Sequence, residues 1–146
     1  MPTPLDLQQL VDGAGDAILV ADADGRIQYW NGAAERIFGY AADEALGRSL
    51  DLIIPERLRE RHWQGYGRVM NTGETRYGND VLRVPALHKD GRALSIAFTV
   101  SMLSDAGRVT GIAAIVRDET ARFAEDRKLR ARLAELEARP TEGERR

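Results

Sequence analysis

The sequence predicts an α+β fold, a five-stranded antiparallel sheet with helices on one face, flanked by an N-terminal helix and a C-terminal amphipathic exit helix. Two observations predict it. Three turn sequences, at 22–25, 88–91 and 104–107, separate apolar segments that alternate as strands do. Between the second and third of the predicted strands, apolar residues recur instead at helical spacing.

The first half of the chain is expected to contribute two strands and three helices. Leu7, Leu10 and Val11 share one face of a helix near the N-terminus, and strands follow at 17–21 and 27–30. Asn31 can accept the free amides at the start of the next helix, which Gly39 can end in a left-handed turn. A shorter helical segment then covers 41–47.

A long helix over 56–71 and three further strands complete the prediction. Pro55 suits the first turn of this helix and Gly73 its end. Strands are expected at 81–87, 93–103 and 109–116, and the middle one alternates most clearly. Its inner face should carry Leu94, Ile96, Phe98, Val100 and Met102. The chain thus divides into a flanking helix (1–12), a domain (13–120), an amphipathic helix (121–139) and a disordered tail (140–146).

Composition narrows the classes of function. The chain has 146 residues, a net charge of −2 and no apolar run as long as a membrane span, so neither nucleic acid nor a membrane is an expected partner. A cytoplasmic location is expected. It has no cysteine, which excludes disulfides and thiolate metal sites. No acid, base and nucleophile are grouped in a known motif, so we do not expect an enzyme.

Three stretches resemble a known family. "ILVADADGRIQYWNGAAERIFGYAADEALGRSL" is similar to the first half of a PAS domain, and "HKDGRALSIAFTVSML" and "GIAAIVRDET" resemble its last strands and exit motif. The resemblance implies a ligand cavity between the long helix and the inner face of the sheet. It also implies that Asp118 and Thr120 couple the last strand to the exit helix. The absence of cysteine rules out the flavin–cysteinyl photochemistry of some light-sensing PAS domains.

The long helix carries a more specific resemblance. "PERLRERHWQGYGRV" is similar to the cavity helix of FixL-type haem PAS domains, with matches at Pro55, Arg61, His62 and Arg68. In that subfamily a histidine at the position of His62 is the axial ligand of haem b. The competing interpretation is that His62 only packs the helix, because similar sequences occur in PAS domains without known haem.

The strands supply the remaining candidate site residues. Ile96, Phe98 and Val100 are expected to line the cavity opposite His62. Leu82 stands where FixL-type domains carry an arginine, while Arg83 should point to the other face of its strand. A haem pocket here would therefore be more apolar, and carbon monoxide or nitric oxide would suit it as well as oxygen.

Three hypotheses for function remain open. The first is a sensor of a small organic ligand, the second a haem-based gas sensor and the third a ligand-free dimerisation module. In each, we expect a homodimer formed through the N-terminal helix, the sheet or the C-terminal helix. The exit helix would connect the domain to an output domain or a partner protein of a signalling pathway such as a two-component system.

Overall fold

The computed structural model describes residues 3–74 and 80–139. It contains one five-stranded sheet in the order β2-β1-β5-β4-β3, with every neighbouring pair antiparallel. The strands are β1 (Ala17–Asp22), β2 (Ile27–Trp30), β3 (Leu82–Leu87), β4 (Ala93–Asp105) and β5 (Arg108–Asp118). The predicted disordered tail, 140–146, lies outside the described residues.

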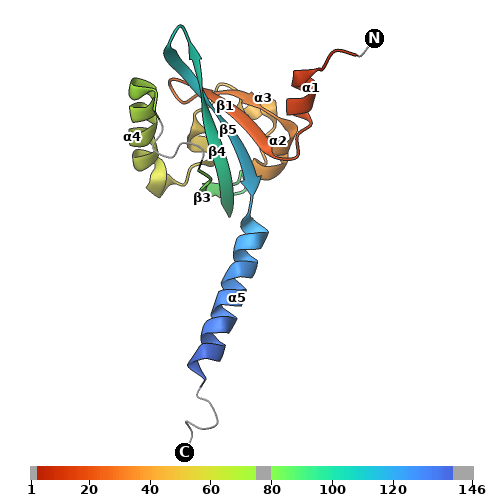
Figure 1. Ribbon diagram of the computed structural model, residues 1–146, viewed down its shortest axis with the longest axis vertical. Coiled ribbons are helices and arrows are strands. Elements are labelled where there is room, and N and C mark those ends of the chain that lie inside the picture. The colour runs from red at the N-terminus through yellow and green to blue at the C-terminus, as the bar shows by residue number, and fades with distance from the viewer. Residues whose placement is uncertain (1–2, 75–79, 140–146) are drawn as a thin grey trace, which may run out of the picture.

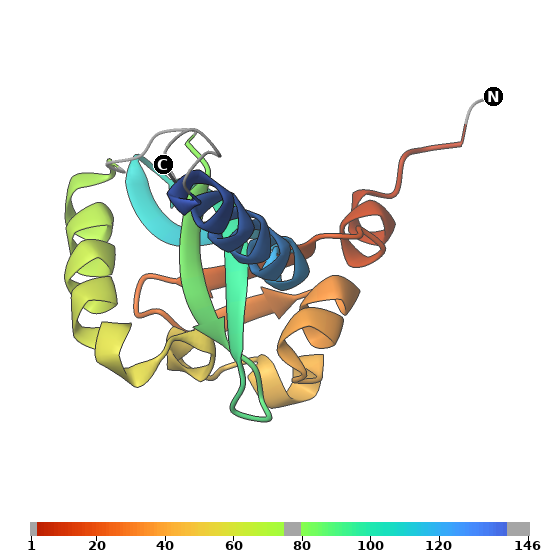
Figure 2. The ribbon, with the colours of Figure 1, turned by 90° about the horizontal axis from the view of Figure 1, so that it is seen from below.

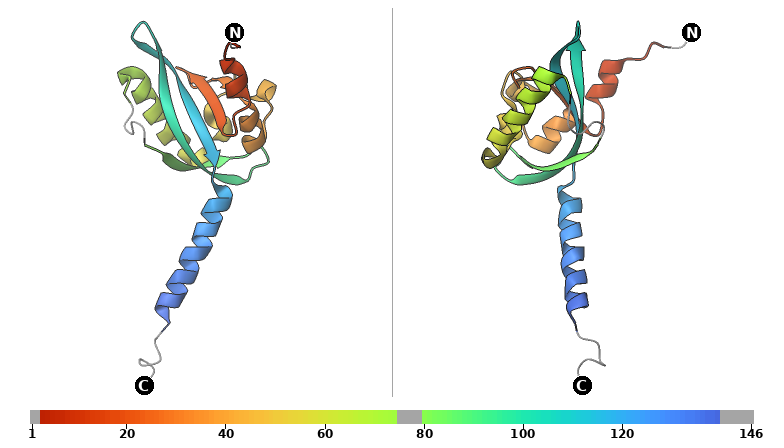
Figure 3. Two further views of the ribbon diagram at one scale, coloured as in Figure 1. Left: turned by 45° about the vertical axis from the view of Figure 1, so that its right-hand side comes forward. Right: turned by 60° about the vertical axis from the view of Figure 1, so that its left-hand side comes forward.

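The helices cover one face of the sheet and extend beyond it (Figure 1). They are α1 (Leu7–Asp12), α2 (Gly32–Phe38), α3 (Ala42–Ala45), the 3₁₀ turn η1 (Leu50–Ile53), α4 (Glu56–Thr72) and α5 (Thr120–Ala138). Seen from below, α4 lies at one end of the inner face and α2 with α3 at the other (Figure 2). In further views α5 projects from the domain without packing against it (Figure 3).

The predicted α+β architecture is confirmed, and the differences are local. The hairpin of β4 and β5 is longer than predicted at its tip, because pairing continues to Asp105 and Arg108 around the turn. The sequence prediction missed η1, where the Ser49 side chain accepts a hydrogen bond from the Asp51 amide at 3.1 Å. That turn is too short to show helical periodicity.

The core lies between the inner face of the sheet and the helices that cover it. Phe38 and Ile27 are its largest fully buried side chains, and Trp30 is buried beside Phe38 with ring centroids 5.4 Å apart. The indole nitrogen of Trp30 donates to the Tyr40 carbonyl at 3.0 Å, so this polar atom is satisfied. Trp30 is therefore a packing residue of the core.

Asn31 is the one buried polar residue among those described, at 2% exposure. Its side-chain oxygen accepts from the amides of Ala34 and Ile18, at 3.0 and 2.9 Å. Its side-chain nitrogen donates to the carbonyls of Val11 and Asp16. The expected cap of α2 is confirmed, and the same side chain also ties α2 to β1, to the last turn of α1 and to the segment between α1 and β1.

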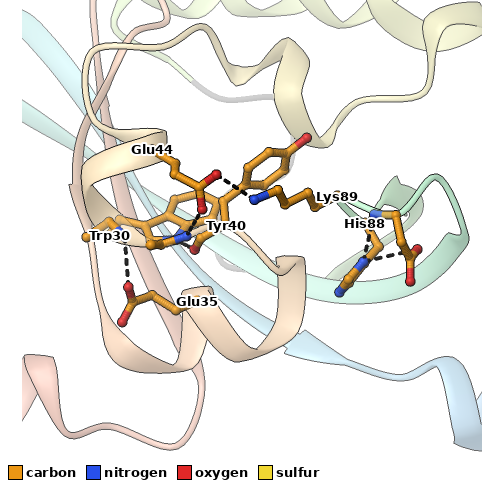
Figure 4. A network of polar contacts seen from close by, with 9 residues as sticks. Trp30, Glu35, Tyr40, Glu44, His88 and Lys89 are labelled. Atoms are coloured by element: carbon orange, nitrogen blue, oxygen red, sulfur yellow. Dashed lines mark hydrogen bonds and ion pairs between the residues drawn. The ribbon is translucent and has the colours of Figure 1, made fainter.

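The turn between β3 and β4 is attached to α2 and α3 (Figure 4). The Lys89 amide donates to the Phe38 carbonyl at 2.9 Å, and the Lys89 ammonium lies 2.5 Å from a carboxylate oxygen of Glu44. The His88 ring packs on Gly39, which has a left-handed φ of +84° and no side chain to obstruct it. These contacts fix the position of β3 and β4 relative to the helices.

Candidate functional site

Helix α4 is held at the turn between β1 and β2. The Trp63 indole donates to an Asp51 carboxylate oxygen at 2.7 Å, and the Tyr66 hydroxyl donates to the Asp22 carbonyl. A Cβ on Gly25 would lie 2.1 Å from the Trp63 ring, so only glycine allows this approach. Burial, with the nearby carboxylates of Asp22 and Asp24, raises the pKa of Tyr66 to about 12 and keeps it a hydrogen-bond donor.

His62 lies half-buried on the side of α4 that carries these contacts. Its ring centroid is 4.7 Å from that of Trp63 and 5.7 Å from that of Tyr66. The Nδ1 atom is buried and has no hydrogen-bond partner among the described residues. Desolvation lowers the pKa of His62, with a smaller opposing effect from the Asp51 carboxylate. The imidazole is therefore neutral near pH 7, which leaves a nitrogen lone pair free to bind a metal.

The strand residues expected opposite His62 share the inner face of the sheet. Leu82 pairs with Phe98 across β3 and β4, and Ile96 and Val100 follow on the same face of β4. Arg83 is exposed and pairs with Ala97 on the other face, as predicted.

These residues differ in how far the protein covers them. Ile96 is part of the core, at 6% exposure, whereas Leu82, Phe98 and Val100 are only half-buried. Two open hollows in the described part of the chain lie elsewhere. One lies beside α1 and the other, about 280 Å³, beside η1; no predicted cavity residue lines either. The apolar strand surface formed by Leu82, Phe98 and Val100 is thus only partly covered, and neither of these two hollows opens onto it.

The exit motif forms a compact hydrogen-bonded junction. One carboxylate oxygen of Asp118 accepts from the Thr120 amide at 2.9 Å and from the Thr120 hydroxyl at 2.5 Å. The Thr120 hydroxyl oxygen in turn accepts from the Ser95 amide at 2.9 Å, and the Glu119 amide donates to the Ser95 carbonyl at 2.7 Å. The start of α5 is thus attached to β4, between the buried residues Leu94 and Ile96.

Sequence reasoning found Asp118 and Thr120 but missed Ser95. Ser95 is a polar residue on an alternating strand, and nothing in the sequence distinguishes it from Ser101. The same is true of Asp22 and Asp51, whose positions in turns suggest only local capping. Their contacts with α4 arise from tertiary packing over sequence separations of 44 and 12 residues.

Within 3–74 and 80–139, no three histidine or carboxylate side chains are grouped so that they could hold a metal ion. In the same ranges, no helix combines the length and the apolar character needed to cross a membrane.

Comparison with known proteins identifies the family. The family model for the PAS fold matches residues 5–118, so this chain belongs to the PAS family. It is 30% identical to the sensor protein FixL of Bradyrhizobium diazoefficiens over 90% of the chain, and 29% identical to the oxygen sensor protein DosP of Escherichia coli over 79%. A PAS domain from Colwellia psychrerythraea shares the fold with a TM-score of 0.69, at 24% identity, covering 79% of this chain and 95% of that one.

The chain is therefore a PAS sensory module related to proteins of signal transduction. It spans 25% of the length of FixL and 14% of that of DosP.

Proposed function

We propose that this module is a cytoplasmic haem-based sensor in which His62 is the axial ligand of the iron. The observation that carries the proposal is the neutral His62 imidazole, whose buried Nδ1 has no partner within 3–74 and 80–139. A buried polar atom without a partner costs about 1–3 kcal/mol. His62 therefore lowers the stability of the ligand-free fold, and a role in ligand binding would account for its presence at this position. The similarity to FixL and to an oxygen sensor supports the same assignment.

Residues of this chain would hold haem from two sides, one formed by α4 and the other by the inner face of the sheet. His62 supplies the nitrogen ligand from α4, and Trp63 and Tyr66 restrain its ring at the distances given above. Leu82, Phe98 and Val100 supply an apolar surface that excludes water. When bound, haem would supply an iron atom able to take up a diatomic gas.

The nature of this surface bears on which gas is sensed. The side chains of Leu82, Ile96, Phe98 and Val100 contain no hydrogen-bond donor. The polarity and the hydrogen-bond donors of a haem pocket would decide how strongly it favours oxygen over other gases, and this surface would offer no donor. We therefore propose carbon monoxide and nitric oxide as signals alongside oxygen.

The signal would leave the domain through the junction of Asp118, Thr120 and Ser95. Ser95 lies between two core residues of β4, so a change in the packing of the inner face shifts its backbone. That backbone holds Thr120 through one hydrogen bond and Glu119 through another. A ligand acts in this way only if it binds two arrangements with different affinity. We propose that a homodimer carries this change through α5 to an output domain or partner.

A second candidate is an organic ligand on the same apolar surface. The observation that favours it is the incomplete burial of Leu82, Phe98 and Val100, which a small apolar molecule would complete. In this case His62 is a packing residue of α4.

Haemin titration distinguishes the two candidates. The purified chain is titrated with haemin and its visible spectrum recorded, beside the variants His62→Ala and His88→Gln. His88 is the matched control, because it is the only other histidine and lies in the turn between β3 and β4. We expect the wild type and His88→Gln to develop the same Soret band and His62→Ala to lose it.

Other results would overturn the assignment. A Soret band of equal intensity in His62→Ala would exclude His62 as the ligand. No band in any of the three proteins would remove haem altogether. Native mass spectrometry would then distinguish the two remaining hypotheses. Extra mass on the protein would indicate a bound organic molecule, whereas a mass that the polypeptide alone accounts for would favour the ligand-free dimerisation module.

A further inference from the structure

The hollow beside η1 is lined in part by apolar and aromatic side chains. It measures about 280 Å³, and Tyr40, Leu52 and Leu87 contribute to its lining, each of them half-buried. These residues come from the segment after α2, from η1 and from the end of β3. The Tyr40 ring also has the Lys89 ammonium 5.7 Å from its centroid (Figure 4). Such a lining suits the apolar body of a small organic molecule.

Two arginines line the same hollow. The guanidinium of Arg59 is held in place, because its Nε donates to the Ile54 carbonyl at 3.0 Å and one terminal nitrogen donates to the Asp51 carbonyl at 3.3 Å. The Arg48 side chain is exposed and forms no hydrogen bond or ion pair with any other described residue. Guanidinium groups with free N–H donors bind carboxylate and phosphate oxygens through paired hydrogen bonds.

The charged groups of the lining favour an anion. Its one carboxylate, that of Asp51, already accepts a hydrogen bond from the Trp63 indole at 2.7 Å and lies 3.9 Å from the Nε of Arg59. The Glu44 carboxylate nearby is paired with Lys89. Two guanidinium groups therefore face one carboxylate that has partners of its own, and the remaining charge of the lining is positive.

We propose that this hollow binds a small organic anion. Its carboxylate or phosphate group is held by Arg48 and Arg59, and its apolar body contacts Tyr40, Leu52 and Leu87. None of the residues proposed to hold haem lines this hollow, so it is a second site.

The bound anion would act on α4. The carboxylate of Asp51 holds the Trp63 indole, and the Trp63 ring packs on the ring of His62 with their centroids 4.7 Å apart. An anion that changes the position of Asp51 therefore changes the support of His62, and a ligand at His62 alters the affinity for the anion by the same factor. Binding of the anion itself does not depend on the proposed role of haem.

The two tryptophans report on the hollow, because their indole N–H groups bond to two of its lining residues. Trp63 donates to Asp51, and Trp30 donates to the Tyr40 carbonyl at 3.0 Å. The haem-free, ¹⁵N-labelled full chain is titrated with benzoate and with phenyl phosphate, and the two indole resonances are followed by NMR. The chain has only these two tryptophans, so Trp63→Phe assigns both resonances.

Both anions should shift the two indole resonances in a saturable way. Half-saturation is expected near about 1 mM, as for other ligands of this size. Benzyl alcohol has the same ring without the charge and should bind at least about tenfold more weakly. Equal affinity for benzyl alcohol, or indole resonances that do not shift with either anion, would overturn the proposal. Inorganic phosphate that binds as tightly as phenyl phosphate would exclude the apolar contacts.

Arg48→Gln tests the residue that supplies the free charge. It should weaken the binding of both anions about tenfold, because it removes one of the two guanidinium groups. Arg57→Gln is the matched control, since Arg57 is exposed on α4 and does not line the hollow. Equal affinity of the wild type and both variants would refute the assignment of Arg48. Because no haem is present, these outcomes are separate from those of the haemin titration.

Discussion

Replacing His62 with phenylalanine should stabilise the ligand-free protein while it abolishes haem binding. Phenylalanine keeps an aromatic ring beside Trp63 and Tyr66 but removes the buried Nδ1, for which the described part of the chain offers no partner. An unsatisfied buried polar atom costs about 1–3 kcal/mol, and we expect a gain at the lower end because the residue is only half-buried. The free energy of unfolding should therefore rise by about 1 kcal/mol near pH 7.5.

The same substitution should change the dependence of stability on pH. Burial lowers the pKa of His62 below its ordinary value of 6.5, so the unfolded chain takes up a proton at a higher pH than the folded protein. The titration of His62 therefore does not reduce the free energy of unfolding above about pH 6.5. Below that pH the free energy of unfolding falls, until the pH reaches the pKa of His62 in the folded protein. The phenylalanine variant lacks this loss, and its advantage over the wild type should grow between about pH 7 and pH 5.

Urea unfolding monitored by circular dichroism at several pH values measures both effects. Gln64→Phe is the control, because Gln64 is exposed on the same helix and should change stability by less than about 0.5 kcal/mol. A His62→Phe variant destabilised by more than about 1 kcal/mol would refute the reasoning. An unchanged pH dependence would show that the imidazole does not titrate in a buried environment.

Three further substitutions test other parts of the structure. Asn31→Ala removes a helix cap and the partner of a buried amide, and should lower the free energy of unfolding by about 3 kcal/mol in urea titrations; a loss below about 1 kcal/mol would contradict the described bonds. Gly25→Ala should destabilise more than Gly47→Ala, because both have a left-handed φ but only Gly25 has a ring, that of Trp63, against it. Equal midpoints would argue against that packing. Thr120→Val should speed hydrogen exchange of the β4 amide bonded to its hydroxyl, and unchanged exchange would exclude a role for this bond in the junction.

Sequence-based prediction succeeds where a structural role depends only on neighbouring residues. The strand from Ile27 to Trp30, the cap at Asn31 and the left-handed stop at Gly39 were all predicted, because each depends on a residue and its immediate neighbours. The alternation along β4 likewise placed Ile96 and Phe98 on one face, and backbone geometry alone guarantees this. Such features need no knowledge of distant contacts.

The candidate site combines both kinds of information. Residue types and their spacing were enough to predict the family, the position of His62 on a long helix and the exit residues Asp118 and Thr120. The folded chain was needed to show that the Nδ1 atom of His62 is buried without a partner among the described residues, and that Ser95 holds the start of α5. Burial and long-range hydrogen bonds depend on which surfaces come into contact when the chain folds. Residue type and spacing alone do not specify these tertiary contacts.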